Sequence, residues 1–431
     1  MIFLTKWKET EIGRIPEDWE LKKMQEVTTK IGDGLHGTPI YANNGDYYFV
    51  NGNNLSSGKV QINDNTKKCA KEEFDKYKKE LNSRTVMVSI NGTLGNIALY
   101  HGEKIILGKS ICYINLKQEV DLFFIKYVLS NSRFQNYAQF NANGTTIKNV
   151  SLRQVREFKF GIPRDIKEQK AISKILSDLD SKVELNDQMN ATLEAMAQAI
   201  FKHWFIDFEF PDENGKPYKS SGGKMVDSER GEIPEKWIVG KLGDLLNNVK
   251  ISLKPSDNLK DRKYVPIDRL STQKIGLEDF LEYTEAKSSL IAFEKDDILV
   301  GAMRVYFHRV NLSPFAGITR TTTFVLRPKI KKQLAYTLFL LNQDSTINYA
   351  SSHSKGSTMP YAVWGGSLDE MKILIPSEEV MIRFNELIYP YLKKIRDSIF
   401  EQKDLSKIRD SLLPKLMSGQ IRVPVEVIKN A

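Results

Sequence analysis

Cysteine and long apolar runs are the features that this sequence has least of. Its two cysteines, Cys69 and Cys112, lie far apart, and neither belongs to a Cys-x-x-Cys motif. We therefore expect two reduced, partly buried thiols, as is usual in a cytosolic protein. No apolar run approaches the roughly 20 residues that a membrane helix needs, and the apolar start, Met1–Leu4, is far too short for a signal peptide. These absences predict a cytoplasmic protein.

The motifs of common nucleotide-dependent enzymes are also missing. The chain has no Gly-x-x-x-x-Gly-Lys-Ser/Thr loop for ATP and no Asn/Asp-Pro-Pro-aromatic tetrapeptide of the kind that a methyltransferase needs. Gly92–Gly95 is short, and we interpret it as a hairpin turn. The five histidines show no metal-ligand spacing; they are His36, His101, His203, His308 and His353.

Paired carboxylates with a nearby lysine, which metal-dependent nucleases need, are absent as well. Glu20–Lys22 has the Glu-x-Lys form, but its only close upstream acid, Asp18, is too near for both to reach one metal. Two further copies, Glu168–Lys170 and Glu401–Lys403, fall in helical sequence and are interpreted as solvated charge. We therefore predict that the chain has no catalytic site and no cofactor or metal of its own.

What the chain does have is length, the composition of a folded protein and a basic excess. At 431 residues it is too long for one ordinary core, so two domains are expected. The hydrophobic fraction of 41% excludes a disordered chain. Lys and Arg number 63 against 54 acidic residues, for a net charge of +9. This excess suits a polyanionic partner, although many soluble proteins share it.

A weak internal repeat is the most informative feature. Gly13–Trp19 (Gly-Arg-Ile-Pro-Glu-Asp-Trp) returns as Gly231–Trp237 (Gly-Glu-Ile-Pro-Glu-Lys-Trp). A second landmark, Phe160–Pro163, returns as Ile373–Pro376, and a charged amphipathic segment follows it in both copies. The period of about 213–218 residues indicates a duplicated domain and not a solenoid of short repeats.

The sequence changes character at each Ile-Pro. Before it, alternating runs such as Thr85–Ile90 and Thr322–Leu326 predict strands, and polar stretches such as Asn51–Asn54 and Asn141–Gly144 predict turns. After it, the apolar period is that of a helix. The predicted order is a first globular domain (1–162), a long helix (163–206), a polar linker (207–227), a second globular domain (228–375), a second long helix (376–418) and a tail (419–431).

The first helix carries a seven-residue repeat that is typical of a coiled coil. One heptad position holds Ile172, Leu179, Asn186, Leu193 and Ile200, and the partner position holds Ile175, Lys182, Met189 and Met196. An Asn in such a stripe costs stability but fixes register. At 1.5 Å per residue the helix is roughly 50–55 Å long, which favours a spacer over the alternative of a helix packed on its own domain.

The second helix has a matching stripe, made of Ile388, Leu392, Ile395 and Ile399 and continued by Leu405, Ile408, Leu412 and Leu416. Pro390 lacks an amide hydrogen and clashes with the preceding turn, so we expect a kink or break there. Two such helices can bury their stripes against each other as an antiparallel pair. The predicted fold class is α+β, with two globular domains separated by two long antiparallel, coiled-coil-like helices in a chain with an internal pseudo-repeat.

Five short motifs stand in order along the chain. They are Asp33–Pro39 (Asp-Gly-Leu-His-Gly-Thr-Pro), Gly144–Thr146 (Gly-Thr-Thr), Glu168–Gln169, His203–Phe208 (His-Trp-Phe-Ile-Asp-Phe) and Leu412–Gly419 (Leu-Leu-Pro-Lys-Leu-Met-Ser-Gly). Together they resemble the specificity (S) subunits of type I restriction–modification systems, over essentially the full length. The second half departs from the pattern, because Gly356–Thr358 reads Gly-Ser-Thr and the Asp-Gly-His-Thr-Pro run has no counterpart. The second domain is therefore expected to read a different sequence.

The resemblance implies a division of labour. Each globular domain is then a target-recognition domain that reads one half of an asymmetric, bipartite site in double-stranded DNA, and the helices hold the domains apart. Two methyltransferase (modification) subunits dock on the helices and methylate adenine with S-adenosylmethionine. Restriction/translocase subunits that use ATP and Mg can join to cut unmodified DNA. Half-sites on one face of B-DNA lie about 34 Å apart, a distance that a helical rod fixes better than a loop does.

Residue type and placement give the candidates for DNA contact, because phosphates attract Lys and Arg whereas base edges are read by Arg, Asn, Gln, Ser and Thr on exposed loops. In the first domain they are Lys30, Asp33, His36, Thr38, Asn51, Asn53, Asn54, Asn91, Thr93 and Asn96. In the second they are Lys250, Ser252, Lys254, Arg269, Arg304, Tyr306, His308, Arg309 and Arg320. Arg304 and Arg309 flank a strand-like Val-Tyr-Phe-His run, so we expect them to point different ways and at most one to read a base.

Two bland alternatives accompany these hypotheses. The Gly- and Asn-rich stretches of the first domain can be turns and nothing more. The whole chain can be a coiled-coil scaffold whose globular ends bind proteins. A basic patch on each domain favours DNA binding, whereas apolar patches favour the scaffold.

Overall fold

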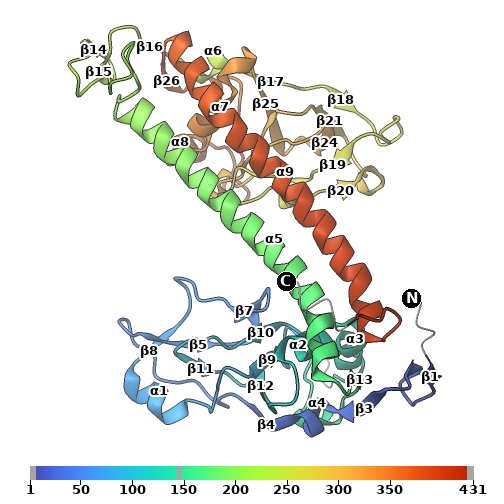
Figure 1. Ribbon diagram of the computed structural model, residues 1–431. Helices are drawn as coiled ribbons and strands as arrows, with labels where there is room; N and C mark the ends of the chain where they lie inside the picture. The colour runs from blue at the N-terminus through green and yellow to red at the C-terminus, as the bar shows by residue number, and fades with distance from the viewer. Residues whose placement is uncertain (1–5, 143–147, 425–431) are drawn as a thin grey trace. The chain divides into compact units, whose positions relative to one another are not determined.

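The computed structural model describes residues 6–142 and 148–424 (Figure 1). The chain divides into two compact units: unit 1 comprises residues 1–182 and 405–431, and unit 2 comprises residues 183–404. Two long helices, α5 (Ile166–Phe201) and α9 (Glu378–Met417), each begin in one unit and end in the other. Met1–Leu4, the Gly144–Thr146 motif and the end of the Asn141–Gly144 stretch lie outside the described residues, as does the tail from residue 425.

Unit 1 is built on two sheets with short helices beside them. The first sheet is antiparallel, in the order β10-β9-β12-β4, with β4 (Thr28–Asp33), β9 (Thr85–Ser89), β10 (Ile97–Leu99) and β12 (Ile111–Leu116). The second has the order β11-β5-β8, with β5 (Tyr47–Val50), β8 (Lys68–Cys69) and β11 (Ile105–Leu107). The other elements are β1 (Trp7–Lys8), β2 (Ile15–Pro16), β3 (Trp19–Lys23), β6 (Leu55–Ser56), β7 (Lys59–Val60), β13 (Lys159–Pro163), α1 (Lys71–Tyr77), α2 (Leu122–Ser130), α3 (Ser132–Asn141) and α4 (Leu152–Glu157).

Unit 2 follows the same plan. Its first sheet has the order β17-β25-β22-β23, with β17 (Leu246–Asn248), β22 (Ile298–Gly301), β23 (Val310–Leu312) and β25 (Thr323–Pro328). The second has the order β18-β21-β24-β19-β20, with β18 (Ser252–Leu253), β19 (Lys263–Tyr264), β20 (Leu281–Glu282), β21 (Leu290–Phe293) and β24 (Gly317–Arg320). The other elements are β14 (Met225–Ser228), β15 (Gly231–Pro234), β16 (Ile238–Lys241), β26 (Lys372–Ile375), α6 (Leu242–Leu245), α7 (Leu334–Leu341) and α8 (Asp344–Ser352).

The strand orders confirm the domain duplication. β4, β12, β9 and β10 follow one another across their sheet as β17, β25, β22 and β23 do in unit 2. The parallel pair β5–β11 recurs as β19–β24, and the antiparallel neighbour β8 recurs as β20. The registers then give residue equivalences. Ser89 corresponds to Gly301, because the first pairs with Ile111 and the second with Thr323, each the first residue of the neighbouring strand.

The repeated sequence landmarks pair with each other in both units. In unit 1, β3 and β13 are antiparallel neighbours, and Trp19 lies opposite Pro163. In unit 2, β16 and β26 pair in the same way, so that Ile238, which follows Trp237, lies opposite Ile375. Both tryptophans are buried. Each landmark pair therefore closes a small sheet at the point where the chain enters a long helix.

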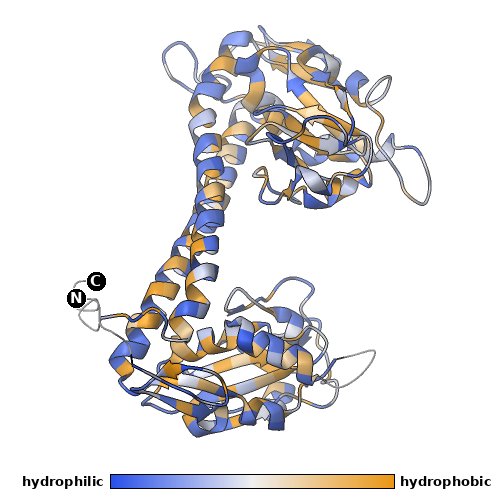
Figure 2. Cartoon of the chain, turned by 90° about the vertical axis from the view of Figure 1, so that its right-hand side faces the viewer, coloured by the Kyte–Doolittle hydropathy of each residue, from blue (hydrophilic) through white to orange (hydrophobic). Residues whose placement is uncertain are grey.

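Apolar strands fill the interior of each unit together with the apolar helices α2 and α7, whereas many of the surrounding loops are hydrophilic (Figure 2). The predicted strand Thr85–Ile90 is confirmed as β9, all of whose residues are buried, and Thr322–Leu326 falls on β25. Cys69 and Cys112 are free and buried, and burial raises the pKa of both thiols. A buried thiol with a raised pKa has little thiolate character, so these cysteines are core residues.

α5 and α9 pack as antiparallel helices, as the fold class predicts. In unit 2, Nδ2 of Asn186 donates to Oε2 of Glu401 at 2.8 Å. One turn further along α5, Asn190 accepts a hydrogen bond from the hydroxyl of Ser398. The partner number falls as the residue number rises, so the two helices run in opposite directions.

One predicted stripe of α5 is confirmed at its centre, and the other is shifted. Asn186 is fully buried. The second buried stripe holds Leu176, Asn190 and Ala197, one residue beyond the predicted set of Ile175, Lys182, Met189 and Met196. Met196 is 44% exposed. Steps of three and four residues fit the same heptad pattern, and the small side chains at Asn190 and Ala197 let the helices approach on this side.

α9 is continuous through Pro390, so the predicted break is wrong. Pro390 and Glu386, whose carbonyl loses its helical partner, both lie on the exposed face, where water can hydrogen-bond the free carbonyl. The buried face carries Ile388, Leu392, Ile395 and Ile399, as predicted. Ile408 of the predicted continuation is 47% exposed.

The end of each long helix packs on a tryptophan landmark. α5 passes into a π-helical turn, Lys202–Ile206, after which Phe208 adopts a φ of +63° and packs edge-on against Trp237. Beyond α9, Gly419 has a φ of +73° and lies against Pro16 and Trp19. A Cβ at this glycine would lie 2.3 Å from Pro16 Cγ, so only glycine fits.

Glu168 is not the solvated charge that its sequence context suggested. It is buried at the start of α5, where Oε1 accepts from the indole of Trp19 at 3.3 Å. Nε of Arg422 donates to the same oxygen at 3.0 Å, and the Arg422 guanidinium also pairs with Asp18 at 2.6 Å. The Glu-Gln motif therefore anchors the helix to the Trp19 landmark and to the segment after α9.

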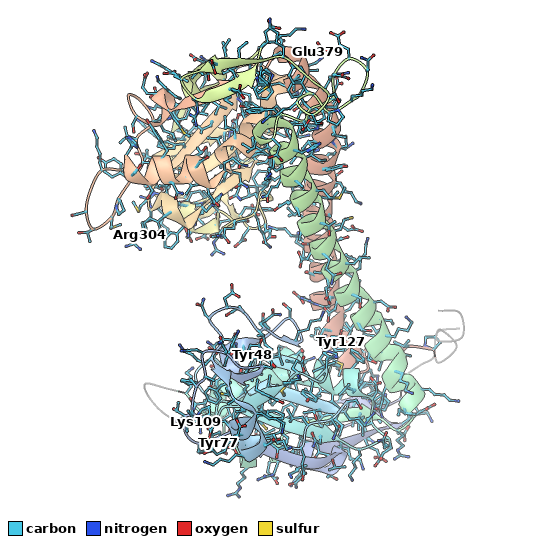
Figure 3. The ribbon with its side chains drawn as sticks, turned by 90° about the vertical axis from the view of Figure 1, so that its left-hand side faces the viewer. Tyr48, Tyr77, Lys109, Tyr127, Arg304 and Glu379 are labelled. Atoms are coloured by element: carbon cyan, nitrogen blue, oxygen red, sulfur yellow. The ribbon has the colours of Figure 1, made fainter. Side chains whose placement is uncertain are left out.

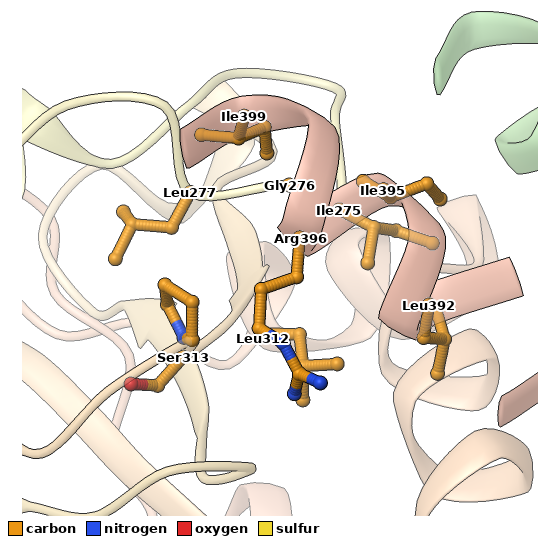
Figure 4. Close-up of a pocket in the computed structure, with 10 residues that line it drawn as sticks. Ile275, Gly276, Leu277, Leu312, Ser313, Leu392, Ile395, Arg396 and Ile399 are labelled. Carbon is orange, nitrogen blue, oxygen red and sulfur yellow. The ribbon is translucent and has the colours of Figure 1, made fainter. Parts of the chain in front are cut away.

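In unit 2, the loop around Ile275 and Gly276 packs on the parts of α5 and α9 that belong to this unit. Oε1 of Glu194 on α5 accepts the backbone amides of Ile275 at 3.1 Å and Gly276 at 3.0 Å. A Cβ on Gly276 would lie 2.7 Å from Cδ1 of Ile399 on α9, so the backbone approaches the helix closely. A cavity of about 20 Å³ remains beside this contact, lined in part by Arg396 (Figure 4).

Candidate nucleic-acid interface

Four loops meet at one end of the sheets in unit 1. They follow β4 (34–39), β5 (51–54), β9 (90–96) and β11 (108–110). The amide of Leu35 donates to the carbonyl of Leu107 at 2.6 Å, and that of Ile90 donates to the carbonyl of Ser110 at 2.8 Å. A Cβ on Gly34 would lie 2.2 Å from the Leu107 carbonyl oxygen, which explains the glycine of the Asp-Gly-Leu-His motif.

Three of the predicted asparagines hold this frame together. Oδ1 of Asn51 accepts from the hydroxyl of Ser110 at 3.1 Å. Oδ1 of Asn54 accepts from the amide of Asn51 at 2.9 Å. Nδ2 of Asn96 donates to the carbonyl of Gly52 at 3.2 Å. These side chains position the loops from within.

Other predicted residues lie on the surface of the frame. His36 and Asp33 are joined by a 2.5 Å contact between Nε2 and Oδ2. Thr38, Asn53 and Thr93 are exposed on three different loops. Their hydroxyls and amide face solvent at the end of the unit, where a duplex can reach them.

Two predicted residues are less well placed. Lys30 lies within β4, three residues before its end, and pairs with Glu80 at 2.7 Å, a hydrogen bond that raises the pKa of Lys30. Asn91 is half-buried and forms a backbone bridge with Asn149. The exposed loops on either side of these two residues are better placed to contact a ligand.

The turn between β11 and β12 supplies a cation that the sequence analysis missed. Lys109 is exposed at the outer side of unit 1 (Figure 3), and no ion pair joins it to a carboxylate in residues 6–142 or 148–424. Its neighbours Gly108 and Ser110 are both bonded into the loop frame. The sequence signal was Gly-Lys-Ser between two apolar runs, which marks a tight turn.

Unit 2 repeats two of the backbone hydrogen bonds of this frame. The amide of Ala302 donates to the carbonyl of Thr322 at 2.8 Å, as Ile90 does to Ser110. The strand registers on both sides make these pairs equivalent. The loop after β22 therefore lies against the β24–β25 turn as its counterpart lies against the β11–β12 turn.

A second bond of the frame is also repeated. The amide of Arg304 donates to the carbonyl of Pro360 at 2.7 Å, as Gly92 does to Lys148 at 3.1 Å. Gly356–Thr358 precedes Pro360 by the same number of residues as Gly144–Thr146, which lies outside the described residues, precedes Lys148. Both domains thus use one backbone arrangement with different side chains.

The strand predicted for Val-Tyr-Phe-His is wrong. Val305–Phe307 is a single 3-10 turn, flanked by Arg304 at a φ of +49° and His308 at +53°. Val305 is buried, whereas Tyr306 is 52% exposed. An alternating pattern does not reveal left-handed residues, so the sequence could not distinguish this turn from a strand.

The predicted side chains of this turn have different surroundings. Nε2 of His308 lies 3.0 Å from Oδ1 of Asn342, so this ring anchors the turn to the helices behind it. The guanidinium of Arg309 stacks over the ring of Phe307 at 5.0 Å from its centroid. Arg304 is exposed at the outer side of unit 2 (Figure 3).

Two more predicted cations lie at the same end of the strands in the second sheet. Leu290 pairs with Leu253 on one side and with Arg320 on the other. Lys254, which follows Leu253, therefore lies at the same end of the sheet as Arg320, and both are exposed. Cations at the same end of two strands, here with β21 between them, suit a run of phosphates.

The remaining candidates of unit 2 are further from this end of the sheet or already paired. Lys250 and Ser252 are exposed on and just before β18, at the end away from Arg320. Arg269 pairs with Asp279 at 2.5 Å, and this hydrogen bond raises the pKa of Arg269. Arg269 is therefore a weaker candidate than Arg320.

The exposed set contains cations, amides and hydroxyls, which are the groups that bind phosphates and base edges. Within the described ranges, no cluster of three or more His, Cys, Asp or Glu side chains is arranged to hold a metal ion. None of the helices in those ranges is long and apolar enough to span a membrane.

A family model described as the type I restriction modification DNA specificity domain matches residues 16–195 and 234–409, more than half of the chain. The chain belongs to this family. The two matches begin at the prolines of the repeated Ile-Pro-Glu landmark. A specificity subunit determines the DNA target of the methylation and restriction complex, is not itself catalytic and carries no cofactor.

Named relatives and a solved structure agree with this assignment. The specificity subunit is 26% identical to the type I restriction enzyme MjaIX specificity subunit of Methanocaldococcus jannaschii, over 97% of each chain. It is 24% identical to the putative type I restriction enzyme MjaX specificity subunit of the same organism, again over 97% of each chain. The crystal structure of the type I restriction–modification S subunit from M. genitalium shares the fold, with a TM-score of 0.58, 18% identity and coverage of 96% of this chain and 98% of that one. Membership implies assembly with the other subunits of such a complex and with DNA.

Proposed function

We propose that unit 1 and unit 2 each read one half of an asymmetric, bipartite site in double-stranded DNA. The observation that carries this proposal is the repeated loop frame. Gly92 in one copy corresponds to Arg304 in the other, and Ser110 corresponds to Thr322. One backbone frame with two sets of side chains is suited to reading two different DNA sequences, because side chains distinguish base edges by the hydrogen-bonding groups that they present.

The candidates at the surface of each unit make the contacts in this proposal. In unit 1 they are Asp33 with His36, Thr38, Asn53, Thr93 and Lys109; in unit 2 they are Lys250, Ser252, Lys254, Arg304, Tyr306 and Arg320. The lysines and Arg320 bind phosphates, and the loop-tip residues contact bases. Asn51, Asn54, Asn96, His308 and Arg309 act indirectly, because they hold the loops in place.

The partners in this proposal are two modification subunits, which bring S-adenosylmethionine and methylate adenine, and restriction/translocase subunits, which bring ATP and Mg. The complex works on cytoplasmic DNA. Leu185 and Met196 on α5 are 58% and 44% exposed and lie 11 residues apart, which places them on one flank of the helix at about 100° per residue. This flank is the proposed docking surface for a helix of the modification subunit.

Methylation mapping tests the proposal. The full chain is co-expressed with the modification subunit from its own genome in a host that lacks adenine methylation, and methylated adenines are located by single-molecule sequencing. We expect one motif with two specific halves and a gap of unspecified bases. No methylated motif, or a single uninterrupted one, would contradict the proposal.

A further inference from the structure

Arg304 stands in a backbone conformation that L-amino acids avoid. Its φ and ψ are +49° and 55°, in the left-handed region. The equivalent residue of unit 1 is Gly92, at a φ of +75°, for which this conformation carries no penalty. The fold therefore requires a left-handed residue at this position in both copies, and only unit 2 fills it with a long side chain.

The backbone of this turn is held without help from the Arg304 side chain. The Arg304 amide donates to the carbonyl of Pro360 at 2.7 Å, and its carbonyl accepts from Phe307 at 3.0 Å. Behind the turn, His308 contacts Asn342. Glycine would satisfy the same hydrogen bonds, so packing does not explain the arginine.

The guanidinium of Arg304 also forms no ion pair or hydrogen bond within residues 6–142 and 148–424. Arg304 is exposed, and no carboxylate among the described residues pairs with it. In contrast, Arg269 is paired with Asp279, and Arg309 stacks on Phe307. A strained residue whose side chain has no internal role points to an external ligand.

We propose that Arg304 reads a guanine in the major groove of the half-site bound by unit 2. This inference rests on the proposed function of that unit. Guanine presents two acceptors, O6 and N7, on its major-groove edge, and the guanidinium fork donates to both at once. A phosphate contact does not need a fixed backbone, and exposed lysines and Arg320 already supply such contacts from unstrained positions. The pre-set left-handed backbone fixes the direction of the fork, which base readout requires.

Two substitutions test this role in the complex with the modification subunits. Arg304→Gly removes the side chain and relieves the strain, since the first copy already has glycine there. Arg304→Lys keeps the charge but cannot donate two parallel hydrogen bonds. Arg320→Ala is the matched control, because it removes from a regular strand of the same unit an exposed arginine that pairs with no carboxylate in the described part of the chain.

The readouts are base preference, selected from a randomised duplex library, the salt dependence of binding and the melting temperature. For Arg304→Gly and Arg304→Lys we expect the preference for guanine to fall roughly 10- to 100-fold at one position of one half-site. The other half-site should stay unchanged. Arg304→Gly should also melt higher than the wild type. Arg320→Ala should weaken binding to all sequences and reduce the salt slope by about one.

Two results would overturn the inference. One is an unchanged base preference in both Arg304 variants. The other is a uniform weakening by Arg304→Gly with a salt slope reduced by about one, which is the behaviour of a phosphate contact. Failure of the wild-type complex to select any bipartite site would instead contradict the proposed function itself, and this inference with it.

Discussion

Asn186 of α5 donates a 2.8 Å hydrogen bond to Glu401 of α9, 215 positions further along the chain, although Asn186 is fully buried. Its other amide atom, Oδ1, has no hydrogen-bond partner among the residues that the structure describes. Such a pair costs stability, but only one alignment of the helices brings the amide to the carboxylate. Asn186 therefore fixes the register of the helix pair within unit 2.

Replacing Asn186 by aspartate tests this role at constant shape. Asn186→Asp places a second carboxylate against Glu401, so the free energy of unfolding should fall by about 2–4 kcal/mol at pH 7. The loss should shrink near pH 4, where one of the two carboxylates binds a proton. Asp187→Asn is the control, because Asp187 lies on the exposed side and accepts from Gln402 at 3.0 Å. Denaturant unfolding measures the free energy of unfolding of both variants. Equal decreases in the two variants would exclude a special role for Asn186.

A half-buried carboxylate in unit 1 predicts sensitivity to acid. Asp180 accepts from Lys126 at 2.7 Å, from the hydroxyl of Tyr127 at 2.7 Å and from Arg409 at 2.8 Å. Burial acts to raise the pKa of Asp180, but Lys126 and Arg409 outweigh it, so this pKa lies below its ordinary value. A lowered pKa stabilises the fold above the ordinary value of about 3.9. That contribution is lost as the pH falls through the lowered pKa.

Asp180→Asn should lower the free energy of unfolding by about 2–4 kcal/mol at pH 7, because two partly buried cations lose their counter-ion. The difference from wild type should narrow as the pH falls from about 5 to about 2. Asp178→Asn removes an exposed charge that pairs with Lys174 and should change stability by less than about 0.5 kcal/mol. If the free energies of unfolding of wild type and Asp180→Asn changed with pH in parallel, the ion pairs of Asp180 would contribute nothing to the pH dependence of stability.

Glu194 predicts the opposite pH dependence in unit 2. Burial raises the pKa of Glu194, and the backbone amides of Gly276 and Ile275 only partly offset this. A raised pKa means that ionisation destabilises the fold above the ordinary value of about 4.3. Glu194→Gln keeps the accepting oxygen without the charge, so it should raise the free energy of unfolding by about 1 kcal/mol at pH 8 and leave it unchanged near pH 4. A loss of stability at pH 8 would mean that the loop needs the charge.

The exposed flank of α5 predicts how the partner binds. Leu185→Glu combined with Met196→Glu should abolish co-purification of the modification subunit, because two charges then face an apolar partner helix. Ala191→Glu combined with Gln198→Glu adds the same charges to the opposite exposed flank and should leave assembly intact.

The specificity subunit alone should bind duplex DNA weakly and gain affinity with its partner. Tight, sequence-specific binding by the lone chain would argue against this dependence.

The sequence predicted the architecture better than the site, for identifiable physical reasons. The repeat around Trp19 and Trp237 was readable because buried aromatics and Ile-Pro pairs recur at matching places. The second stripe of α5 was predicted one residue too early. A heptad pattern allows steps of three or four residues between the stripes, and the choice depends on how closely the two helices approach each other. The burial of Glu168 was not predictable because its partners, Trp19 and Arg422, are distant in sequence.

At the candidate site, the backbone geometry of the loops was the feature that the sequence predicted least well. The left-handed conformation of Arg304 leaves no mark in hydropathy, so its turn resembled a strand. The commitment of Asn51 to Ser110 and of His308 to Asn342 depends on contacts between distant loops. Lys109 was missed because a single lysine in a turn is common, and only the frame around it singles it out.

Exchange of residues 1–160 for the equivalent domain of another specificity subunit tests the central claim most directly. The claim is that the two copies of the loop frame read their half-sites independently. Methylated motifs are mapped for the parent and the chimera, each assembled with the same modification subunit. The account predicts that one half of the motif changes to that of the donor, while the other half and the gap stay the same. A chimera that changes both halves, or neither, would contradict it.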